Sequence, residues 1–374
     1  MKINILQQDL LPGLQAVSRS CGVKSSLPVL ANILLQAEND KLKLSATNLE
    51  IGVIKEINAQ VIEEGELTVP AKTLVDVVSS LSGAEITLEA SGEQLKISTP
   101  HFNALLNGIS ATEFPSIPLS SDKSITVSGK DVHISLPQVS FAAASDEGRP
   151  ILTGILTEIK NDNLELVATD GFRLAHKKTT LSGTNGANFK ALIPRRTFEE
   201  LIRLVSEEIG SKEVDQMLEV STSENQNQII FKVGNTKLSS RLIEGNFPAW
   251  EKIIPTTMVS SAVIDRTSLL KAVKLAAVFA KSDTANIVKL ELKDGKLRLT
   301  SEAKELGGQE SDIEAKTEGI GLLIAFNSKF LIDALQNSNA DDVQIEFSGN
   351  LSPALIRPVG EEGLEYVVMP VRLS

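Results

Sequence analysis

The segment ALIPRRTFEELIRLV, residues Ala191–Val205, joins an apolar run, a proline and a helical pattern, which predicts a strand that turns directly into an amphipathic helix. The same succession occurs in Leu67–Leu81 (LTVPAKTLVDVVSSL) and in Leu323–Leu335 (LIAFNSKFLIDAL). The residue before each helix recurs at offsets of 124 and 133 positions: Pro70, Pro194 and Asn327. The chain of 374 residues is therefore predicted to hold three copies of one unit, with a period far longer than that of a solenoid.

Two further patterns recur with the same period. Apolar and polar residues alternate in Lys41–Leu49 (KLKLSATNL), Asn163–Gly171 (NLELVATDG) and Lys296–Lys304 (KLRLTSEAK), as expected of half-buried strands. Near the ends of the first two units, Glu113-Phe114-Pro115 matches Asn246-Phe247-Pro248. Each unit therefore contains strands of period two beside its helix.

A second helical pattern opens each unit. Asp9–Cys21 and Asp265–Lys281 carry apolar residues at helical spacing, so Cys21 is expected on a buried stripe. The middle copy, Lys130–Ala144, contains Pro137, which should kink or interrupt a helix.

These repeats predict an α+β protein of three similar domains, each with two helices packed on antiparallel sheet. Short stretches rich in Ser, Pro and Thr place the boundaries at residues 1–122, 123–255 and 256–374. We expect the units to join side by side, with continuous sheets on one side and helices on the other.

Composition narrows the class of protein. The net charge is −11, which argues against a protein coated with DNA-binding surface but allows one basic face. A single cysteine, the lack of a secretion signal and the lack of an apolar run of about 18 residues predict a cytoplasmic protein with no membrane role. Aromatic residues are scarce, which disfavours binding of single strands by base stacking.

Residues that could carry catalysis are not grouped in the sequence. The histidines His101, His133 and His176 have no metal-site spacing, and phosphate-loop and nucleophile-elbow motifs do not occur. The adjacent acids Asp146-Glu147 and Glu361-Glu362 are typical of solvated turns. We therefore predict a scaffold or binding protein with no catalytic residue, metal or cofactor, although an enzyme site assembled from distant residues stays an alternative.

Positive charge gathers in the helices. Lys271, Lys274 and Lys281 share one helical face, and the helix after Pro194 begins with Arg195 and Arg196. Solvated helix faces would explain each residue singly. If the helices lie on one side of the sheets, however, they form a basic surface that binds phosphates without sequence preference.

Four segments resemble the bacterial DNA polymerase III beta subunit, or sliding clamp, family: Ser26–Ala37 (SLPVLANILLQA), Val167–Ala175 (VATDGFRLA), Ser240–Pro248 (SRLIEGNFP) and Tyr366–Leu373 (YVVMPVRL). The resemblance implies a ring made by a head-to-tail homodimer, with helices lining the hole. It implies that the ring encircles double-stranded DNA and gives a polymerase processivity. The DNA-facing residues carried over, or placed by helix position, are Lys24, Lys72, Arg195, Arg196, Lys271 and Lys281.

The family also has a pocket for short linear peptides of the polymerase III alpha subunit, the clamp loader, other polymerases and repair proteins. The positions implied here are Leu152, Thr169, Gly171, Phe172, Arg173, Leu174, Pro248, Lys252, Ile253, Ser352, Pro353, Val367, Val368, Met369, Pro370, Val371, Arg372 and Leu373. Apolar members form a floor for leucine or phenylalanine anchors, while Arg173 and Arg372 can hold polar groups. Phe172 stands where a histidine is expected, Lys252 where an arginine is expected, and Ser374 extends the chain by one residue.

The resemblance assigns Mg²⁺ and ATP to the partners and not to this chain. The rival prediction is a peptide-binding scaffold that does not encircle DNA, in which the helix cations would point in scattered directions.

Overall fold

The computed structural model describes residues 1–22, 26–119, 124–146, 148–181, 184, 188–209, 217–223, 227–280, 286–293, 295–303 and 307–372. The chain divides into two compact units. Unit 1 holds Met1–Lys130 and Glu200–Leu242, and unit 2 holds Asp131–Glu199 and Ile243–Ser374. Two of the three unit boundaries fall inside α3 (Gly129–Ser140) and α4 (Arg195–Ile209), and the third follows Leu242.

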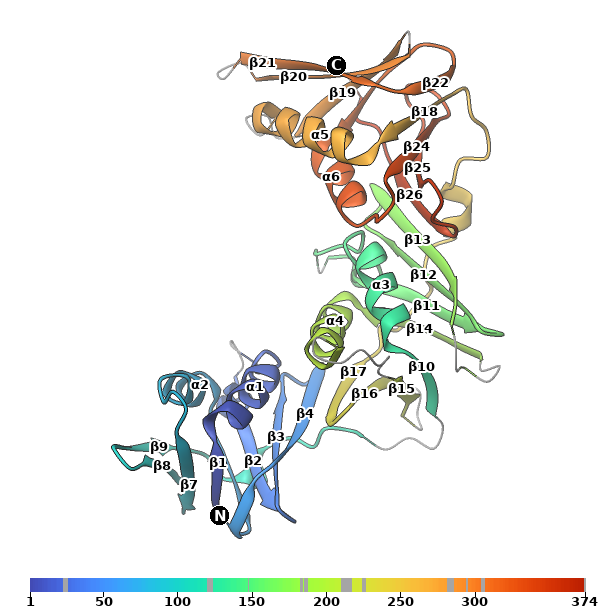
Figure 1. The fold of residues 1–374 in the computed structure, drawn as a ribbon. Coiled ribbons are helices and arrows are strands. Elements are labelled where there is room, and N and C mark those ends of the chain that lie inside the picture. The colour runs from blue at the N-terminus through green and yellow to red at the C-terminus, as the bar shows by residue number, and fades with distance from the viewer. Residues whose placement is uncertain are drawn as a thin grey trace. The chain divides into compact units, whose positions relative to one another are not determined.

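Unit 1 contains two antiparallel sheets and the helices α1 (Gln7–Ser18) and α2 (Ala71–Ser79), which lie side by side (Figure 1). One sheet has the order β5 (Gln60–Glu63), β1 (Lys2–Leu6), β7 (Glu85–Ser91), β8 (Gln94–Thr99) and β9 (Phe102–Asn107). The other has the order β10 (Ser124–Ser128), β15 (Met217–Thr222), β16 (Gln228–Val233), β17 (Thr236–Arg241), β4 (Ile51–Asn58), β3 (Lys41–Thr47), β2 (Asn32–Glu38) and β6 (Gly65–Pro70).

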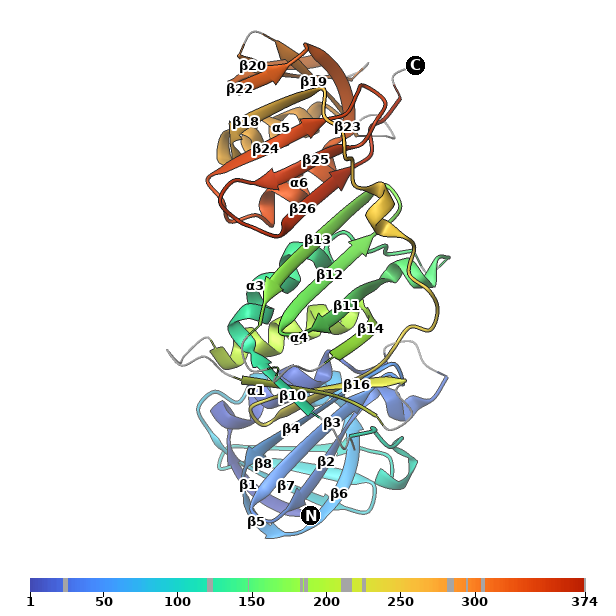
Figure 2. The same cartoon turned by 90° about the vertical axis from the view of Figure 1, so that its right-hand side faces the viewer.

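Unit 2 repeats this plan with the helices α5 (Arg266–Ala280) and α6 (Ser328–Gln336). Its larger sheet, seen face-on in Figure 2, has the order β14 (Asn188–Pro194), β11 (Gly154–Lys160), β12 (Asn163–Thr169), β13 (Arg173–Thr180), β26 (Leu364–Val368), β25 (Ala354–Pro358), β24 (Asp342–Phe347), β18 (Ser260–Asp265) and β22 (Lys316–Gly319). Its smaller sheet has the order β21 (Gly307–Glu314), β20 (Lys296–Ala303), β19 (Ile287–Lys293) and β23 (Leu322–Asn327).

The predicted passage from strand to helix is confirmed in all three repeats. β6 runs into α2, β14 into α4 and β23 into α6 with no residue between them. The three strands of alternating residues are β3, β12 and β20, each buried at the apolar positions of its pattern. Local sequence alone therefore fixes these elements, because their periodicities of 3.6 and 2 agree with the sides that are buried.

Two local expectations are wrong. Cys21 lies beyond the end of α1 and not on its buried stripe; α1 buries Leu10, Leu14 and Val17 instead. Of the kink or interruption predicted at Pro137, the interruption does not occur, because α3 continues to Ser140. One helix turn from the end, the proline removes a single backbone hydrogen bond, and burial of its neighbours Leu136 and Val139 offsets that loss.

Sheets run without a break from one repeat into the next, as predicted. In unit 1, β4 of the first repeat pairs with β17 of the second, with Gly52 opposite Ser239. In unit 2, β13 of the second repeat pairs with β26 of the third, with Leu174 opposite Val367. In both units, the fourth strand of one repeat pairs with the last strand of the next repeat.

No helix in the described ranges has the length and apolar character needed to cross a membrane.

We predict that Leu14→Ala lowers the free energy of unfolding of unit 1 by about 3 kcal/mol, because the fully buried side chain leaves a cavity among α1 and its neighbours. Leu49→Ala is the matched control; Leu49 is 56% exposed in the same unit and should change the free energy by less than about 0.5 kcal/mol. Urea denaturation followed by circular dichroism measures both. Equal effects would show that α1 does not anchor this core.

Candidate functional site

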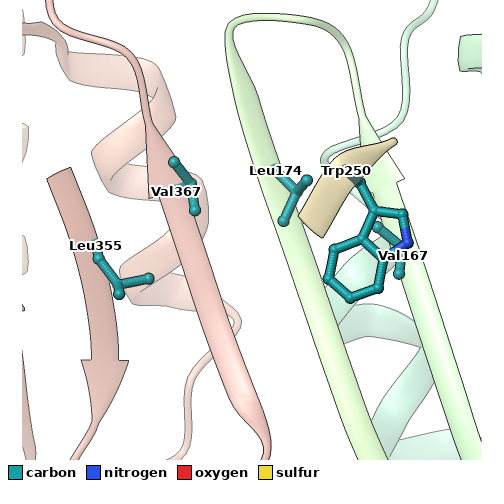
Figure 3. Packing of buried hydrophobic residues seen from close by; sticks show 5 residues of the cluster. All are labelled: Val167, Leu174, Trp250, Leu355 and Val367. Atoms are coloured by element: carbon teal, nitrogen blue, oxygen red, sulfur yellow. The ribbon is translucent and has the colours of Figure 1, made fainter. Parts of the chain in front are cut away.

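An apolar cluster forms where the second and third repeats share a sheet. Val167 of β12, Leu174 of β13, Leu355 of β25 and Val367 of β26 lie close together with Trp250, which begins a short 3-10 helix, Trp250–Ile253 (Figure 3). Only Trp250, at 8%, exceeds 1% exposure among them. Half-buried Leu156, Phe247, Ile253 and Ile254 pack against the cluster.

Strand register brings these side chains together. Leu174 pairs with Val367 across β13 and β26, and Val367 pairs with Leu355 across β26 and β25. Paired residues of an antiparallel sheet point to the same face. The cluster is therefore one face of four adjacent strands, β12, β13, β26 and β25, covered at its edge by Trp250.

The turn between β12 and β13 forms one rim of the cluster. Gly171 has a φ of 90°, which favours glycine, and the Asp170 carboxylate accepts hydrogen bonds from the backbone N–H groups of Phe172 (2.9 Å) and Arg173 (3.0 Å). Phe172 is 57% exposed, and its carbonyl accepts a hydrogen bond from the N–H of Met369 at 2.9 Å. The turn is thus held to the segment that follows β26.

Arg173 is used inside the protein. Its Nε and Nη1 pair with the carboxylates of Asp170 (3.0 Å) and Asp333 (2.5 Å), and Nη2 donates to the carbonyl of Phe141 at 2.8 Å. The guanidinium also stacks on the rings of Phe141 and Phe330, and the side chain is 9% exposed. Its charge is therefore compensated within the protein, where it links β13 to α6.

Of the remaining predicted positions in the described part of the chain, Ile253 packs against the cluster. Lys252 and Ile253 lie in the helix of Trp250, just after Pro248. Leu152 lies in the 3-10 helix Pro150–Thr153, while Ser352 and Pro353 form the turn between β24 and β25. Val368 is buried, whereas Met369, Pro370 and Val371 are half-buried, Arg372 is exposed, and Leu373 lies outside the described residues.

Sequence reasoning missed several residues of the cluster and its rim: Val167, Phe247, Trp250, Leu355 and Arg149. Arg149 places Nη1 3.0 Å from the position that a Cβ of Gly171 would take, so it covers the β12–β13 turn. The one tryptophan of the chain and the matched Phe-Pro motif were signals that could have identified Trp250 and Phe247.

A charged network supports the cluster beneath Trp250. The His176 ring lies 4.6 Å from the Trp250 ring, with Nε2 3.0 Å from Glu165 and Nδ1 3.4 Å from Glu365. A hydrogen bond from His176, together with Arg357, lowers the pKa of the Glu365 carboxyl despite its partial burial. Burial opposes the charge of Arg357, but Glu365 and Glu346 outweigh it and raise the pKa of the guanidinium. These charges hold neighbouring strands together.

The described residues include no group of three or more His, Cys, Asp and Glu that could hold a metal ion. Burial raises the pKa of the Cys21 thiol to about 12, so the thiolate needed for nucleophilic attack is scarce at neutral pH. The apolar surface that can meet another side chain belongs to the half-buried residues packed on the cluster, such as Phe247 and Ile253.

The predicted DNA-facing cations differ in their surroundings. Lys24 and Lys281 lie outside the described residues. Lys72, Arg196 and Lys271 are exposed on α2, α4 and α5. Arg195 is half-buried, pairs with Glu199 at 2.7 Å and also donates to the carbonyl of Ala143.

Family models for the DNA polymerase III beta subunit match almost the whole chain. The N-terminal domain model matches residues 1–118, the central domain model residues 126–249 and the C-terminal domain model residues 251–372. The three-fold repeat therefore corresponds to three clamp domains, as the sequence predicted.

Two similar proteins are both named beta sliding clamp. The beta sliding clamp of Synechococcus elongatus is 34% identical over 380 residues, and that of Staphylococcus aureus strain N315 is 28% identical over 383 residues. The first match covers 100% of both chains, and the second covers 100% of this chain and 99% of the relative.

Two solved structures resemble this chain over their full length. A Pseudomonas aeruginosa sliding clamp bound to griselimycin has a TM-score of 0.91 at 28% identity, and the Bacillus subtilis clamp has a TM-score of 0.92 at 25% identity. Both matches cover 100% of each chain. The prediction of a non-catalytic accessory subunit is confirmed by these names, and the chain belongs to the DNA polymerase III beta subunit family, the beta sliding clamps.

Proposed function

We propose that two copies of this chain close head to tail into a ring around duplex DNA and hold a replicative polymerase on it. Three domains, residues 1–122, 123–255 and 256–374, make up each half of the ring, which acts in the cytoplasm. The match of all three domain models in order supports this function most strongly. A ring replaces dissociation of a tethered polymerase by rapid recapture at high local concentration.

Sheet pairing supports the closure. Within each unit, the fourth strand of one repeat pairs with the last strand of the next, β4 with β17 and β13 with β26. Two strands of these kinds have no such partner in the described sheets: β9, the last strand of the first repeat, and β21, the fourth strand of the third repeat. Both lie at the edge of their sheets. Pairing β9 of one copy with β21 of the other uses the same contact again and closes the ring.

The internal repeats also supply the register. Gly52 and Leu174 occupy equivalent positions opposite Ser239 and Val367, and the equivalent residue of β21 is Gly308. The β8–β9 hairpin has the connection length of the β16–β17 hairpin, which makes Leu105 the counterpart of Ser239. Leu105 is 58% exposed, and Gly308 leaves room for its side chain.

The apolar cluster is proposed to bind the peptides of the polymerase III alpha subunit, the clamp loader, other polymerases and repair proteins. Apolar anchors would pack on half-buried Phe247 and Ile253, which cover the Trp250 cluster, and Phe172 adds an exposed ring. Arg149, Lys252 and Arg372 are exposed and form no ion pair with any described residue, so they can receive carbonyls or carboxylates. Arg173 positions the rim of the site, and these three cations would contact the peptide.

Retention on circular DNA tests the proposal. The protein is loaded onto nicked plasmid by a clamp loader with ATP, the complex is isolated, and the plasmid is then linearised. Protein that stays on circles and leaves linear DNA through its ends is a topological clamp. Retention that ignores the ends would instead support a peptide-binding scaffold without encirclement.

Ile253→Ala is predicted to weaken binding of a labelled peptide with leucine and phenylalanine anchors by about 1–2 kcal/mol, a 5- to 30-fold loss, because Ile253 packs at the edge of the cluster. Fluorescence polarisation measures the affinity, and the emission of Trp250, the single tryptophan, reports occupancy independently. Ile62→Ala, at an exposed position on β5, is the control and should leave the affinity unchanged. Peptide that binds both variants equally well binds elsewhere.

Leu105→Lys is predicted to raise the dimer dissociation constant at least about tenfold, because closure would bury an ammonium group without a partner. Ile62→Lys makes the same substitution at a site of similar exposure on the opposite edge strand of the same sheet. Analytical ultracentrifugation compares the two. A dimer weakened only by the Ile62 change would place the interface at β5.

A further inference from the structure

The cations of the helices fall into two classes. Those of α4, and Arg19 just after α1, are mostly paired with carboxylates, and those of α5 are not. If the chain encircles DNA as proposed, this difference indicates which helix binds the phosphates.

α4 carries more acid than base. Its sequence, RRTFEELIRLVSEEI, has three arginines and four glutamates. Glu200, 8% exposed, pairs with Arg19 at 2.8 Å and with Arg203 at 3.5 Å, and Glu207 takes a second nitrogen of Arg19 at 3.0 Å. A phosphate that approached Arg19 or Arg203 would meet these glutamates, and the arginine would have to give up a partner to bind it.

The other glutamates of α4 are engaged as well. Glu199 pairs with Arg195 at 2.7 Å, and Glu208 pairs with Lys55 at 3.5 Å. Arg196 is the one arginine of this helix that forms no ion pair with a described residue. The summed charge of α4 therefore gives phosphates no net attraction.

α5 has the opposite character. Its sequence, RTSLLKAVKLAAVFA, contains three cations and no carboxylate. Arg266 is committed to the carbonyls of Ala340 and Leu335, but Lys271 and Lys274 are exposed and form no ion pair with a described residue. Asp265, before the helix, interacts electrostatically with Lys271, yet its carboxylate is held by the N–H of Ser268 at 2.7 Å.

Exposed apolar residues continue this face. Leu275 and Val278 follow Lys271 and Lys274 at helical spacing and are 51% and 56% exposed. They offer phosphates no hydrogen bond. The stripe thus combines two exposed ammonium groups with apolar side chains that bind phosphate weakly, which suits a protein that must slide.

We propose that α5, through Lys271 and Lys274, is the principal phosphate-binding helix of the chain, and that the arginines of α4 serve as internal ion pairs. The ligand is the phosphate backbone of duplex DNA, bound without regard to sequence. Because each phosphate neutralised releases condensed counterions, the salt dependence of binding measures how many phosphates the protein neutralises.

The test compares two double variants of the full chain that remove the same charge, Lys271→Gln/Lys274→Gln and Arg195→Gln/Arg203→Gln. Fluorescence anisotropy follows binding to a labelled 30-base-pair duplex over a range of salt concentrations. The lysine variant should lower the slope of log K against log salt by about 1.8, because each neutralised phosphate contributes about 0.9, while the arginine variant keeps the wild-type slope. Lys271→Arg/Lys274→Arg preserves the charge and should restore the slope.

Equal loss of slope in both double variants, or a larger loss in the arginine variant, would overturn the assignment to α5. Circular dichroism confirms that each variant is folded. Retention on circular plasmid separates this result from the proposed function: a wild-type chain that is retained on circles while both slopes fall equally is a clamp with a different phosphate surface. A wild-type chain that is not retained on circles refutes encirclement itself.

Discussion

The pairing of β13 with β26 is the interaction on which the candidate site depends. Five residue pairs, from Arg173 opposite Val368 to Lys177 opposite Leu364, join segments nearly two hundred positions apart in the chain. Neither strand forms an apolar cluster alone. Once paired, they bring Leu174 beside Val367 and allow the hydrogen bond from Met369 to Phe172 that holds the rim. The cost of closing so long a loop is met by burial along the whole ladder.

Arg173 reinforces this junction from the opposite side. A guanidinium only 9% exposed is stable when its donors are all satisfied, and here two carboxylates, a carbonyl and two aromatic rings surround it. Loss of one partner would leave an uncompensated charge, which typically costs about 3–5 kcal/mol. In this structure Arg173 therefore joins β13 to α6 through its ion pair with Asp333.

A net charge of −11 is compatible with holding DNA because charge is distributed unevenly among the helices. α4 balances its arginines with glutamates, whereas α5 has lysines without acids. A closed ring needs little attraction, since the topological link prevents escape, and strong contacts would slow its movement. The ion pairs of Arg19, Arg195 and Arg203 compensate the glutamates of α4.

The sequence by itself determined the repeated elements, because helix and strand periodicity depends only on neighbouring residues. Strands β3, β12 and β20 and the passages into α2, α4 and α6 all lie where their patterns predicted, and the motifs VATDGFRLA and YVVMPVRL marked both halves of the site. Only the tertiary structure decided which contacts the residues of those motifs make. Local pattern could not show that Arg173 turns inward or that Trp250 covers the cluster. It also could not show which helix cations meet a carboxylate, as Arg19 does on reaching Glu200, because such partners lie far apart in sequence and are set by packing.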